Sequence, residues 1–388
     1  MCMLCNQARA QRFAAGTGGD GTPVYSLSIA PEGLIDNSNA AYTERATATD
    51  GVLDYYLHTP GGAVTVAGGG FGEQRIDSVS MSSVDQAYFR AMVERLDAIL
   101  DLDFRESSSA SGADVDFFYD MEIELGGGGN TLGLATTSGR GGWELFVNYP
   151  EVEFDENYRR YVLIHEFGHA LGLEHPFEGG DGDTVNGTTD PWASAFPEET
   201  VMAYRNPLGD SWPEFFTEND LNALIDVWGA ETRVFTNERD LITGASYRDI
   251  LLGAGGDDEL RGRRGADRLE GGSGNDQVMG GDGADELFGG SGDDWIFAGY
   301  GHDLINGGAG NDQIRGGFGG DLFRLSQGDD VIEDFRLTEN DRLGLQAGVG
   351  FELQQQGNDL QVITSLGTTT LWGVDLQSFL AEDRVVTV

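Results

Sequence analysis

The residues with the clearest chemical signature form one stretch, His165-Glu166-Phe167-Gly168-His169-Ala170-Leu171-Gly172-Leu173-Glu174-His175. It holds three of the five histidines of the chain, spaced by four and then six residues. Residues 158–164, directly before it, contain neither glycine nor proline and follow the acidic cluster Asp155-Glu156-Asn157. This pattern predicts a capped helix that runs into the stretch, with His165 and His169 on one face. Gly172 then lets the chain turn back and bring the third histidine towards the other two.

Three neutral imidazoles suit Zn²⁺, and a catalytic zinc keeps three protein ligands and one position for water. We therefore expect His165, His169 and His175 to bind one zinc ion. Bound zinc lowers the pKa of its water to about 7. Glu166, next to the first histidine, is placed to take the proton and pass it to a leaving amine. The alternative is a surface helix that carries histidines by coincidence, which the complete HExxHxxGxxH pattern disfavours.

A second signature follows His175 after about 27 residues, at Thr200-Val201-Met202-Ala203-Tyr204. Together the two signatures resemble the metzincin metalloproteases, and among them the serralysin-like branch of extracellular bacterial zinc endopeptidases. The resemblance implies that Met202 forms a turn beneath the zinc. It also implies that Tyr204 is a fifth, displaceable zinc ligand that stabilises the oxyanion. Taken alone, Met202 would be interpreted as a core residue. Ala203 and Arg205 differ from the serine and tryptophan usual in that branch, which concerns the substrate groove more than the metal site.

Composition limits the classes of partner. The chain of 388 residues has 66 acidic residues against 23 basic ones, all arginine, and a formal net charge of −43. So acidic a surface disfavours binding to nucleic acid and adsorption to anionic lipid. No apolar run approaches 18 residues, so we expect no membrane insertion. The N-terminal residues lack the apolar core of a secretory signal peptide.

The two cysteines, Cys2 and Cys5, form a C-x-x-C pair near the N-terminus. Such thiolates can bind zinc or form a redox pair. Two interpretations stay open: inert thiols at a frayed terminus, or a thiolate that occupies the zinc and keeps an enzyme latent. We assign residues 1–45 to an N-terminal segment that is a candidate propeptide.

We expect an α+β zinc metallopeptidase domain at residues 46–232, in an order of elements that fits the upper half of a metzincin catalytic domain. The predicted elements are two short strands around a Pro-Gly-Gly turn within 53–71, a helix at 83–102 capped by Ser83, buried strands at 115–119 and 143–148, and a closing helix at 219–229. The acidic loop between His175 and Met202 is either a calcium site or a solvated surface loop. In both cases it is expected to border the substrate cleft.

From Gly244 to Arg324 the chain repeats every nine residues, nine times without a break. The eighth position is always apolar and the sixth is always aspartate: Asp249, Asp258, Asp267, Asp276, Asp285, Asp294, Asp303, Asp312 and Asp321. This GGxGxDxUx period is similar to that of calcium-binding RTX repeats. We expect each unit to be a glycine-rich turn, whose aspartate and carbonyl oxygens bind Ca²⁺, followed by a short strand. A flexible acidic linker, the alternative, has no reason to keep an apolar residue in phase with its carboxylates.

The thin core of such a roll predicts that it folds only when calcium binds, outside the cell. We expect the RTX roll at residues 233–324, and a β cap with a type I secretion signal at residues 325–388. The predicted fold class is therefore an α+β metzincin catalytic domain followed by an all-β parallel β-roll (RTX) domain.

The function predicted is that of a secreted, extracellular, monomeric zinc endopeptidase that cleaves polypeptide substrates and leaves the cell through a type I apparatus. One alternative is a calcium-dependent RTX binding or adhesion protein with a catalytically silent metal domain. A purely structural RTX surface protein, the other alternative, would not require the complete zinc signature.

Overall fold

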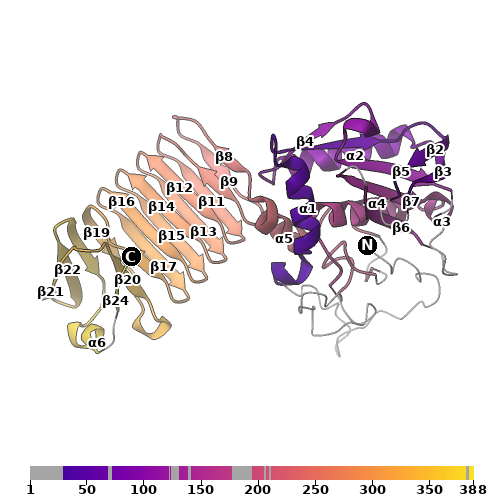
Figure 1. Ribbon diagram of the computed structural model, residues 1–388. Coiled ribbons are helices and arrows are strands. Elements are labelled where there is room, and N and C mark those ends of the chain that lie inside the picture. The colour runs from indigo at the N-terminus through magenta and orange to yellow at the C-terminus, as the bar shows by residue number, and fades with distance from the viewer. Residues whose placement is uncertain are drawn as a thin grey trace. The chain divides into compact units, whose positions relative to one another are not determined.

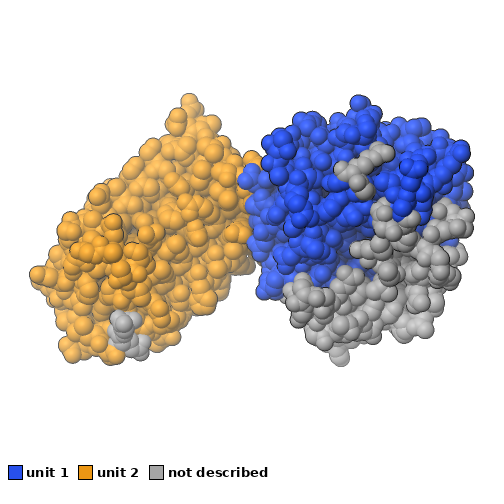
Figure 2. All heavy atoms as spheres, in the orientation of Figure 1, with its two compact units in different colours: residues 1–229 blue, residues 230–388 orange. Residues whose placement is uncertain are grey.

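The computed structural model describes residues 29–68, 72–121, 123, 131–138, 141–176, 195–204, 207–208, 211–381 and 384–388. The chain divides into two compact units, Met1–Gly229 and Ala230–Val388 (Figures 1 and 2). The predictions for Cys2, Cys5 and Arg205, and for most of the acidic loop after His175, fall outside the described residues. None of the helices in the described part is long and apolar enough to cross a membrane.

Unit 1 is built on a seven-stranded mixed sheet in which β2-β3-β5-β1-β4 form the main path and β7 pairs with both β5 and β6. The strands are β1 (Val52–Leu57), β2 (Gly62–Val66), β3 (Gln74–Val79), β4 (Asp103–Glu106), β5 (Val115–Asp120), β6 (Gly133–Thr137) and β7 (Trp143–Asn148). β5 and β7 are buried along their whole length, and each buries three consecutive apolar or aromatic residues together with two polar ones. The Pro-Gly-Gly turn does join two strands, but β1 pairs with β4 and β5 whereas β2 pairs with β3.

The helices of unit 1 are η1 (Pro31–Leu34), α1 (Asn37–Thr47), α2 (Ser83–Asp97), η3 (Ala110–Gly112), α3 (Tyr149–Val152), α4 (Glu156–Leu171) and α5 (Glu218–Trp228). Two details predicted for α2 were wrong. Its cap is Ser82, whose side chain accepts from the Asp85 amide, and not Ser83. It ends at Asp97 because the amides of Ile99 and Leu100 both donate to the Leu96 carbonyl, which closes the last turn before β4.

The predicted helix of the histidine stretch is α4, and both of its predicted ends are confirmed. The Asp155 side chain accepts from the Tyr158 amide, and Gly172 ends the helix with a φ of +105°. Phe167 fixes α4 to the hydrophobic core, because its ring centroid lies 5.3 Å from that of Phe89 and 5.5 Å from that of Phe117. The sequence did not predict α1, which spans the boundary that we had set at residue 45.

Unit 2 is a roll of two largely parallel sheets, whose successive strands alternate between the sheets as far as β20 (Figure 1). The strands are β8 (Thr232–Val234), β9 (Leu241–Thr243), β10 (Ile250–Leu252), β11 (Glu259–Arg264), β12 (Arg268–Ser273), β13 (Gln277–Asp282), β14 (Glu286–Ser291), β15 (Trp295–Tyr300), β16 (Leu304–Ala309), β17 (Gln313–Phe318), β18 (Leu322–Arg324), β19 (Gly328–Ile332), β20 (Arg342–Leu345), β21 (Phe351–Gln356), β22 (Asp359–Thr364), β23 (Gly367–Leu371) and β24 (Val385–Thr387), with η5 (Leu337–Glu339) and α6 (Leu376–Leu380). Residues 18 positions apart are therefore neighbours, as in the pair Leu269 and Leu287. The apolar eighth positions are at most 3% exposed and form the thin core that was predicted.

Candidate metal centre

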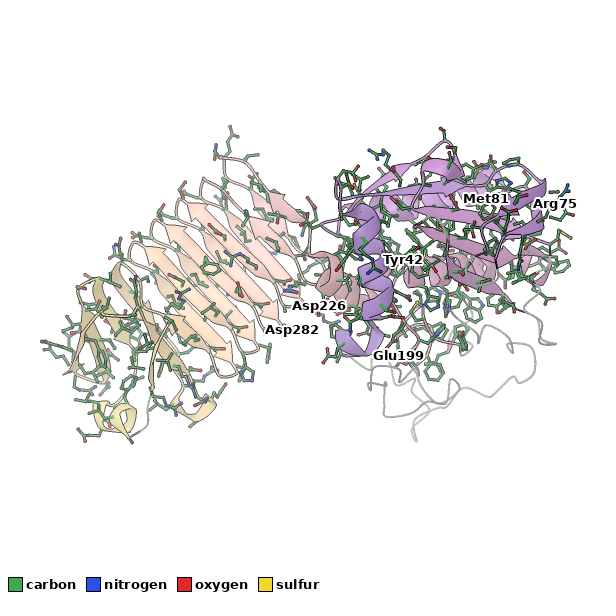
Figure 3. All side chains as sticks on the ribbon, in the orientation of Figure 1. Tyr42, Arg75, Met81, Glu199, Asp226 and Asp282 are labelled. Carbon is green, nitrogen blue, oxygen red and sulfur yellow. The ribbon has the colours of Figure 1, made fainter. Side chains whose placement is uncertain are left out.

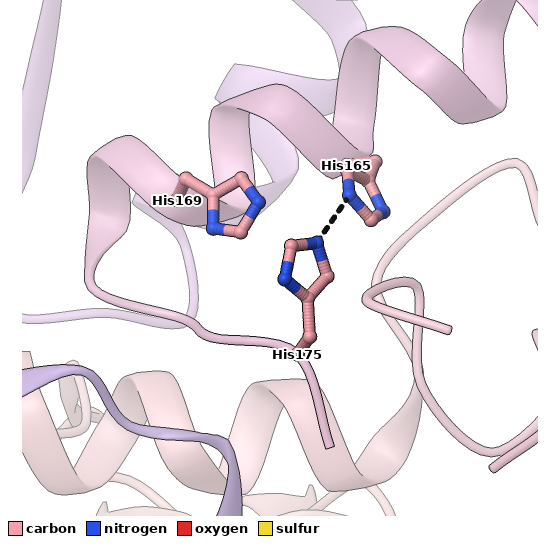
Figure 4. Close-up of side chains that lie close together, drawn as sticks. All are labelled: His165, His169 and His175. Carbon is pink, nitrogen blue, oxygen red and sulfur yellow. Dashed lines mark hydrogen bonds between the residues drawn. The ribbon is translucent and has the colours of Figure 1, made fainter. Parts of the chain in front are cut away.

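The structure brings the three predicted zinc ligands together. His165 and His169 project from α4, and His175 approaches them from the segment that follows Gly172 (Figure 4). Their candidate ligand atoms all lie within 4.8 Å of one another. In the described part of the chain, this is the one group of three or more histidine, cysteine, aspartate or glutamate side chains with such an arrangement.

Backbone carbonyls fix the direction of two of the three imidazoles. His165 Nδ1 lies 2.8 Å from the Val201 carbonyl oxygen, and His169 Nδ1 lies 3.0 Å from the Leu173 carbonyl oxygen. Because a carbonyl only accepts, each Nδ1 must carry the proton and donate it. In the neutral imidazole, Nε2 then carries the lone pair that can bind a metal.

The remaining nitrogens fit a cation. His165 Nε2 and His175 Nε2 are 3.1 Å apart, the contact drawn in Figure 4. His169 Nε2 is buried and has no hydrogen-bond partner among the described residues. Tetrahedral zinc with Zn–N bonds of about 2.0–2.1 Å places its ligand nitrogens roughly 3.3 Å apart. A set of close, buried imidazole nitrogens is therefore suited to zinc.

Glu166 lies between α4 and strand β6. Its side chain is buried, and a methyl group added at Gly133 would come within 2.1 Å of Oε1. The carboxylate therefore packs directly on the backbone of β6, at a position where only glycine leaves enough room. The sequence identified Glu166 but not Gly133, because no strand is predicted between residues 119 and 143.

The turn that contains Met202 and Tyr204 lies against the histidines. Met202 is buried. Its sulfur packs against Gly168 of α4, where an added methyl group would lie only 2.7 Å from the sulfur, so the absence of a side chain at Gly168 leaves room for Met202. The Tyr204 ring centroid is 4.6 Å from that of His175 and 5.7 Å from that of His165. The turn is also held by the hydroxyl of Tyr161, a residue of α4, which donates to the Ala203 carbonyl at 2.6 Å.

The repeats of unit 2 form a second candidate metal centre, for calcium. The nine aspartates in phase are all buried, and the amide of most of them donates to Oδ1 of the aspartate 18 residues later, as Asp267 donates to Asp285 at 2.9 Å. The other oxygen, Oδ2, points to the neighbouring turn. A methyl group at Gly262 would lie 2.3 Å from Asp267 Oδ2 and 2.6 Å from the Gly280 carbonyl oxygen. A carboxylate and a carbonyl oxygen thus converge, which is the ligand type that calcium prefers.

The nine aspartates are not equivalent. Oδ2 is buried without a hydrogen-bond partner in the described residues at Asp258, Asp267, Asp276, Asp285, Asp294, Asp303, Asp312 and Asp321. In Asp249 both oxygens accept protein hydrogen bonds, Oδ1 from Arg233 and Oδ2 from the Ala245 amide, each at 2.6 Å. The structure therefore distinguishes eight open carboxylates from a closed one at the start of the roll.

Burial raises the pKa of these carboxyl groups. The pKa of Asp267 rises to about 8, and the pKa values of Asp303 and Asp321 rise to about 7, with neighbouring carboxylates of the stack adding to the effect. Removal from water disfavours the charged form of a carboxyl group. At neutral pH each buried position therefore favours binding of a proton or a cation.

Three groups that hold the candidate zinc ligands and the turn beside them were missed by the sequence analysis. They are the Leu173 and Val201 carbonyls and the Asp220 side chain, which accepts from the Val201 amide at 2.9 Å. No side-chain pattern can reveal the two carbonyls. Asp220 does have a sequence signal, since Thr217-x-x-Asp220 is a capping box that α5 uses.

Comparison with known proteins identifies the repeats. The model of the RTX calcium-binding nonapeptide repeat (4 copies) matches residues 236–269, 243–278, 270–304, 279–314 and 297–332. The chain therefore carries RTX calcium-binding repeats in unit 2, and the nine aspartates predicted to bind calcium lie within the matched residues.

Similarity to a protease is weaker and partial. Serralysin from Photorhabdus laumondii subsp. laumondii is 28% identical over 152 residues, which cover 35% of this chain and 31% of that protein. The chain thus spans about a third of the length of this curated relative.

Among solved structures, the extracellular lipase LipA from Serratia marcescens is 21% identical, with 41% of each chain covered and a TM-score of 0.20. The AlgE6R3 subunit of the Azotobacter vinelandii mannuronan C5-epimerase is 22% identical, with a TM-score of 0.23 and coverage of 40% of this chain and 82% of that one.

Proposed function

We propose that the protein is a secreted zinc endopeptidase of the serralysin-like metzincin type, stabilised by a calcium-bound RTX roll. The observation that carries the proposal is the convergence of three buried imidazoles, one with an Nε2 that has no partner among the described residues, together with the buried carboxylate of Glu166 on the helix that carries two of them. The partial similarity to serralysin supports the same class.

In this proposal His165, His169 and His175 hold zinc, which supplies Lewis-acid activation of the attacking water and the scissile carbonyl. Glu166 accepts the proton of the water and delivers it to the leaving amine. The Tyr204 hydroxyl donates a hydrogen bond to the oxygen on which negative charge develops. Met202 and the carbonyls of Val201 and Leu173 keep the imidazoles in place.

The roll has a structural role in the proposal. The eight open aspartates bind several calcium ions, and the binding free energy of calcium contributes the folding free energy of the roll. Millimolar calcium outside the cell matches the dissociation constants of about 10⁻⁴ to 10⁻³ M that are typical of extracellular calcium modules. We propose that the chain is exported unfolded through a type I apparatus, folds as a monomer outside the cell, and cleaves polypeptides there.

Hydrolysis of casein by calcium-loaded protein tests the activity. We expect hydrolysis that a zinc chelator abolishes, that added zinc restores, and that Glu166→Gln lowers by about 10²–10⁴-fold, the usual share of a general base. The chelator must be removed before calcium and zinc are restored, so that loss of the roll is not mistaken for loss of zinc. Zinc-loaded wild type without activity on any polypeptide would favour the alternative, an RTX binding or adhesion protein.

A further inference from the structure

The Thr200–Tyr204 turn is hydrogen-bonded to a carboxylate that lies outside the histidine stretch. Asp220, on α5, is 0% exposed, and its two oxygens accept four hydrogen bonds. The donors are the Thr200 hydroxyl at 2.5 Å, the Val201 amide at 2.9 Å, and the amide and hydroxyl of Thr217, both at 2.8 Å. Glu199, labelled in Figure 3, precedes this turn, and its carbonyl accepts from the side-chain amide of Asn219 at 2.8 Å.

These bonds form one continuous chain that starts at a zinc-binding imidazole. His165 Nδ1–H donates to the Val201 carbonyl at 2.8 Å, and the same peptide group ends in the Met202 N–H, which donates to Thr200 Oγ1 at 3.1 Å. The Thr200 hydroxyl in turn donates to Asp220 Oδ1. His165, Val201, Met202, Thr200 and Asp220 are all buried, so water does not compete with the chain.

We propose that Asp220 is a positioning residue that acts on His165 through this hydrogen-bonded chain, as a remote carboxylate of a carboxylate–histidine–metal arrangement. Metal-binding histidines commonly donate their second N–H to a carboxylate or carbonyl, which fixes the ring and raises its basicity. Here the peptide group between Val201 and Met202 and the Thr200 hydroxyl transmit the effect. The carboxylate orients both groups, and hydrogen bonds in series polarise one another, so the Val201 carbonyl becomes a better acceptor for His165.

The chain also explains why a carboxylate is kept where burial disfavours its charge. Burial raises the pKa of Asp220, and hydrogen bonds from Thr200, Val201 and Thr217 lower it again. A helix cap alone would need only Thr217 and its bonds to the start of α5. The two bonds to the Thr200–Tyr204 turn add nothing to that cap.

The inference rests on the proposed zinc site, and zinc affinity tests the two separately. Thr200→Val keeps the shape of the side chain but removes the link between Met202 and Asp220, whereas Thr200→Ser keeps the link. Zinc affinity is measured by competition with a chelator on the full, calcium-loaded chain, with the unfolding temperature of the zinc-free form alongside. We expect Thr200→Val and Asp220→Asn to bind zinc about 10–100-fold more weakly, as for other groups behind metal ligands. Thr200→Ser should bind about as tightly as wild type.

Two further measurements make the outcome decisive. Thr217→Val is the matched control, since it disturbs the cap of α5 without breaking the chain to His165, and it should leave zinc affinity unchanged. In the Co²⁺-substituted protein, Asp220→Asn should change the visible absorption spectrum, which reports ligand geometry, and Thr217→Val should not. Unchanged zinc affinity and cobalt spectrum in Thr200→Val and Asp220→Asn would overturn the inference. If Thr200→Val does not fold, Asp220→Asn alone decides. Wild type that binds no zinc would instead refute the proposed function.

Discussion

At the scale of single residues, the proposed zinc site depends on a glycine outside the histidine stretch. A side chain at position 133 would collide with Glu166, because a methyl group there comes within 2.1 Å of Oε1. The Glu166 carboxylate therefore packs against the β6 backbone in a space that any residue larger than glycine at position 133 would fill. The residue at position 133 therefore determines the position of Glu166, the proposed general base, although glycine has no functional side chain.

This contact predicts a specific loss of activity for Gly133→Ala. The carboxylate must move away from its place against β6, and misplacement of a catalytic group by about 1 Å can lower turnover on the order of 10²-fold. We expect kcat/KM for peptide hydrolysis to fall by about that factor while the chain still binds one zinc. Gly112→Ala serves as the control, because the nearest atom to its methyl group is 3.9 Å away. Equal activity in the two variants would show that catalysis does not depend on the position that Glu166 takes against β6.

At the scale of elements, the segment before α1 supports the bend between His169 and His175. The Asp36 amide donates to the Gly172 carbonyl at 2.7 Å, and the Glu174 amide donates to the Leu34 carbonyl at 2.8 Å. Ile35 and Leu173 form an antiparallel bridge between these two bonds. Because the Leu173 carbonyl also accepts from His169, this segment supports the bend that carries the proposed zinc ligands.

Helix α1 extends the same support. Tyr42, labelled in Figure 3, donates from its hydroxyl to the Ser138 carbonyl at 3.1 Å. The Thr43 hydroxyl donates to the Ala170 carbonyl at 2.6 Å and so satisfies one free carbonyl at the end of α4. Residues 34–47 are therefore part of the folded unit, and N-terminal processing that preserves function must stop before them.

Two truncations test the role of this segment. Removal of residues 1–28 keeps the whole segment from Pro31 to Thr47 and should leave zinc affinity as in the full chain. Removal of residues 1–36 deletes the strand-like support and should weaken zinc binding by about tenfold or more. Chelator competition measures both. Tight zinc binding after the longer truncation would contradict this account.

The roll predicts different roles for two aspartates at equivalent repeat positions. Asp285 has an open oxygen, whereas Asp249 is closed by Arg233 and the Ala245 amide. We expect Asp285→Asn to remove at least one bound calcium, and Asp249→Asn to leave calcium stoichiometry unchanged and lower only thermal stability. Isothermal titration calorimetry distinguishes the two. Loss of calcium in Asp249→Asn would mean that all nine aspartates bind alike.

At the scale of the whole molecule, we expect calcium and protons to compete for the buried aspartate oxygens of the roll. The raised pKa values, between about 6 at Asp285 and about 8 at Asp267, lie above the value of about 3.9 in an unfolded chain. The folded, metal-free roll thus binds more protons than the unfolded chain. Its stability is fully present below about pH 4 and is lost as the pH rises through roughly 6–8.

Circular dichroism of the full chain tests this linkage. In EGTA, the β-sheet signal should be larger at pH 5 than at pH 8, because protonation removes the buried charges. With millimolar calcium the signal should be high at pH 8. Equal spectra under all three conditions would show that the roll folds without help from calcium or protons.

The sequence predicted those parts of the molecule that depend on side-chain type and period. The ligand spacing on α4, its cap at Asp155, its end at Gly172 and the phase of the repeats are of this kind. It missed α1 and β6, because small, polar or glycine-rich segments become ordered through tertiary contacts. Backbone groups such as the Val201 carbonyl, and the difference between Asp249 and its repeats, appear only when distant segments are brought together.

Metal analysis of extensively dialysed, calcium-loaded protein is the most direct test of the zinc site on which the account depends. Inductively coupled plasma mass spectrometry should find one zinc per chain in the wild type and in Glu166→Gln, and none in His169→Ala. Wild type without stoichiometric zinc, or His169→Ala that retains it, would contradict the account.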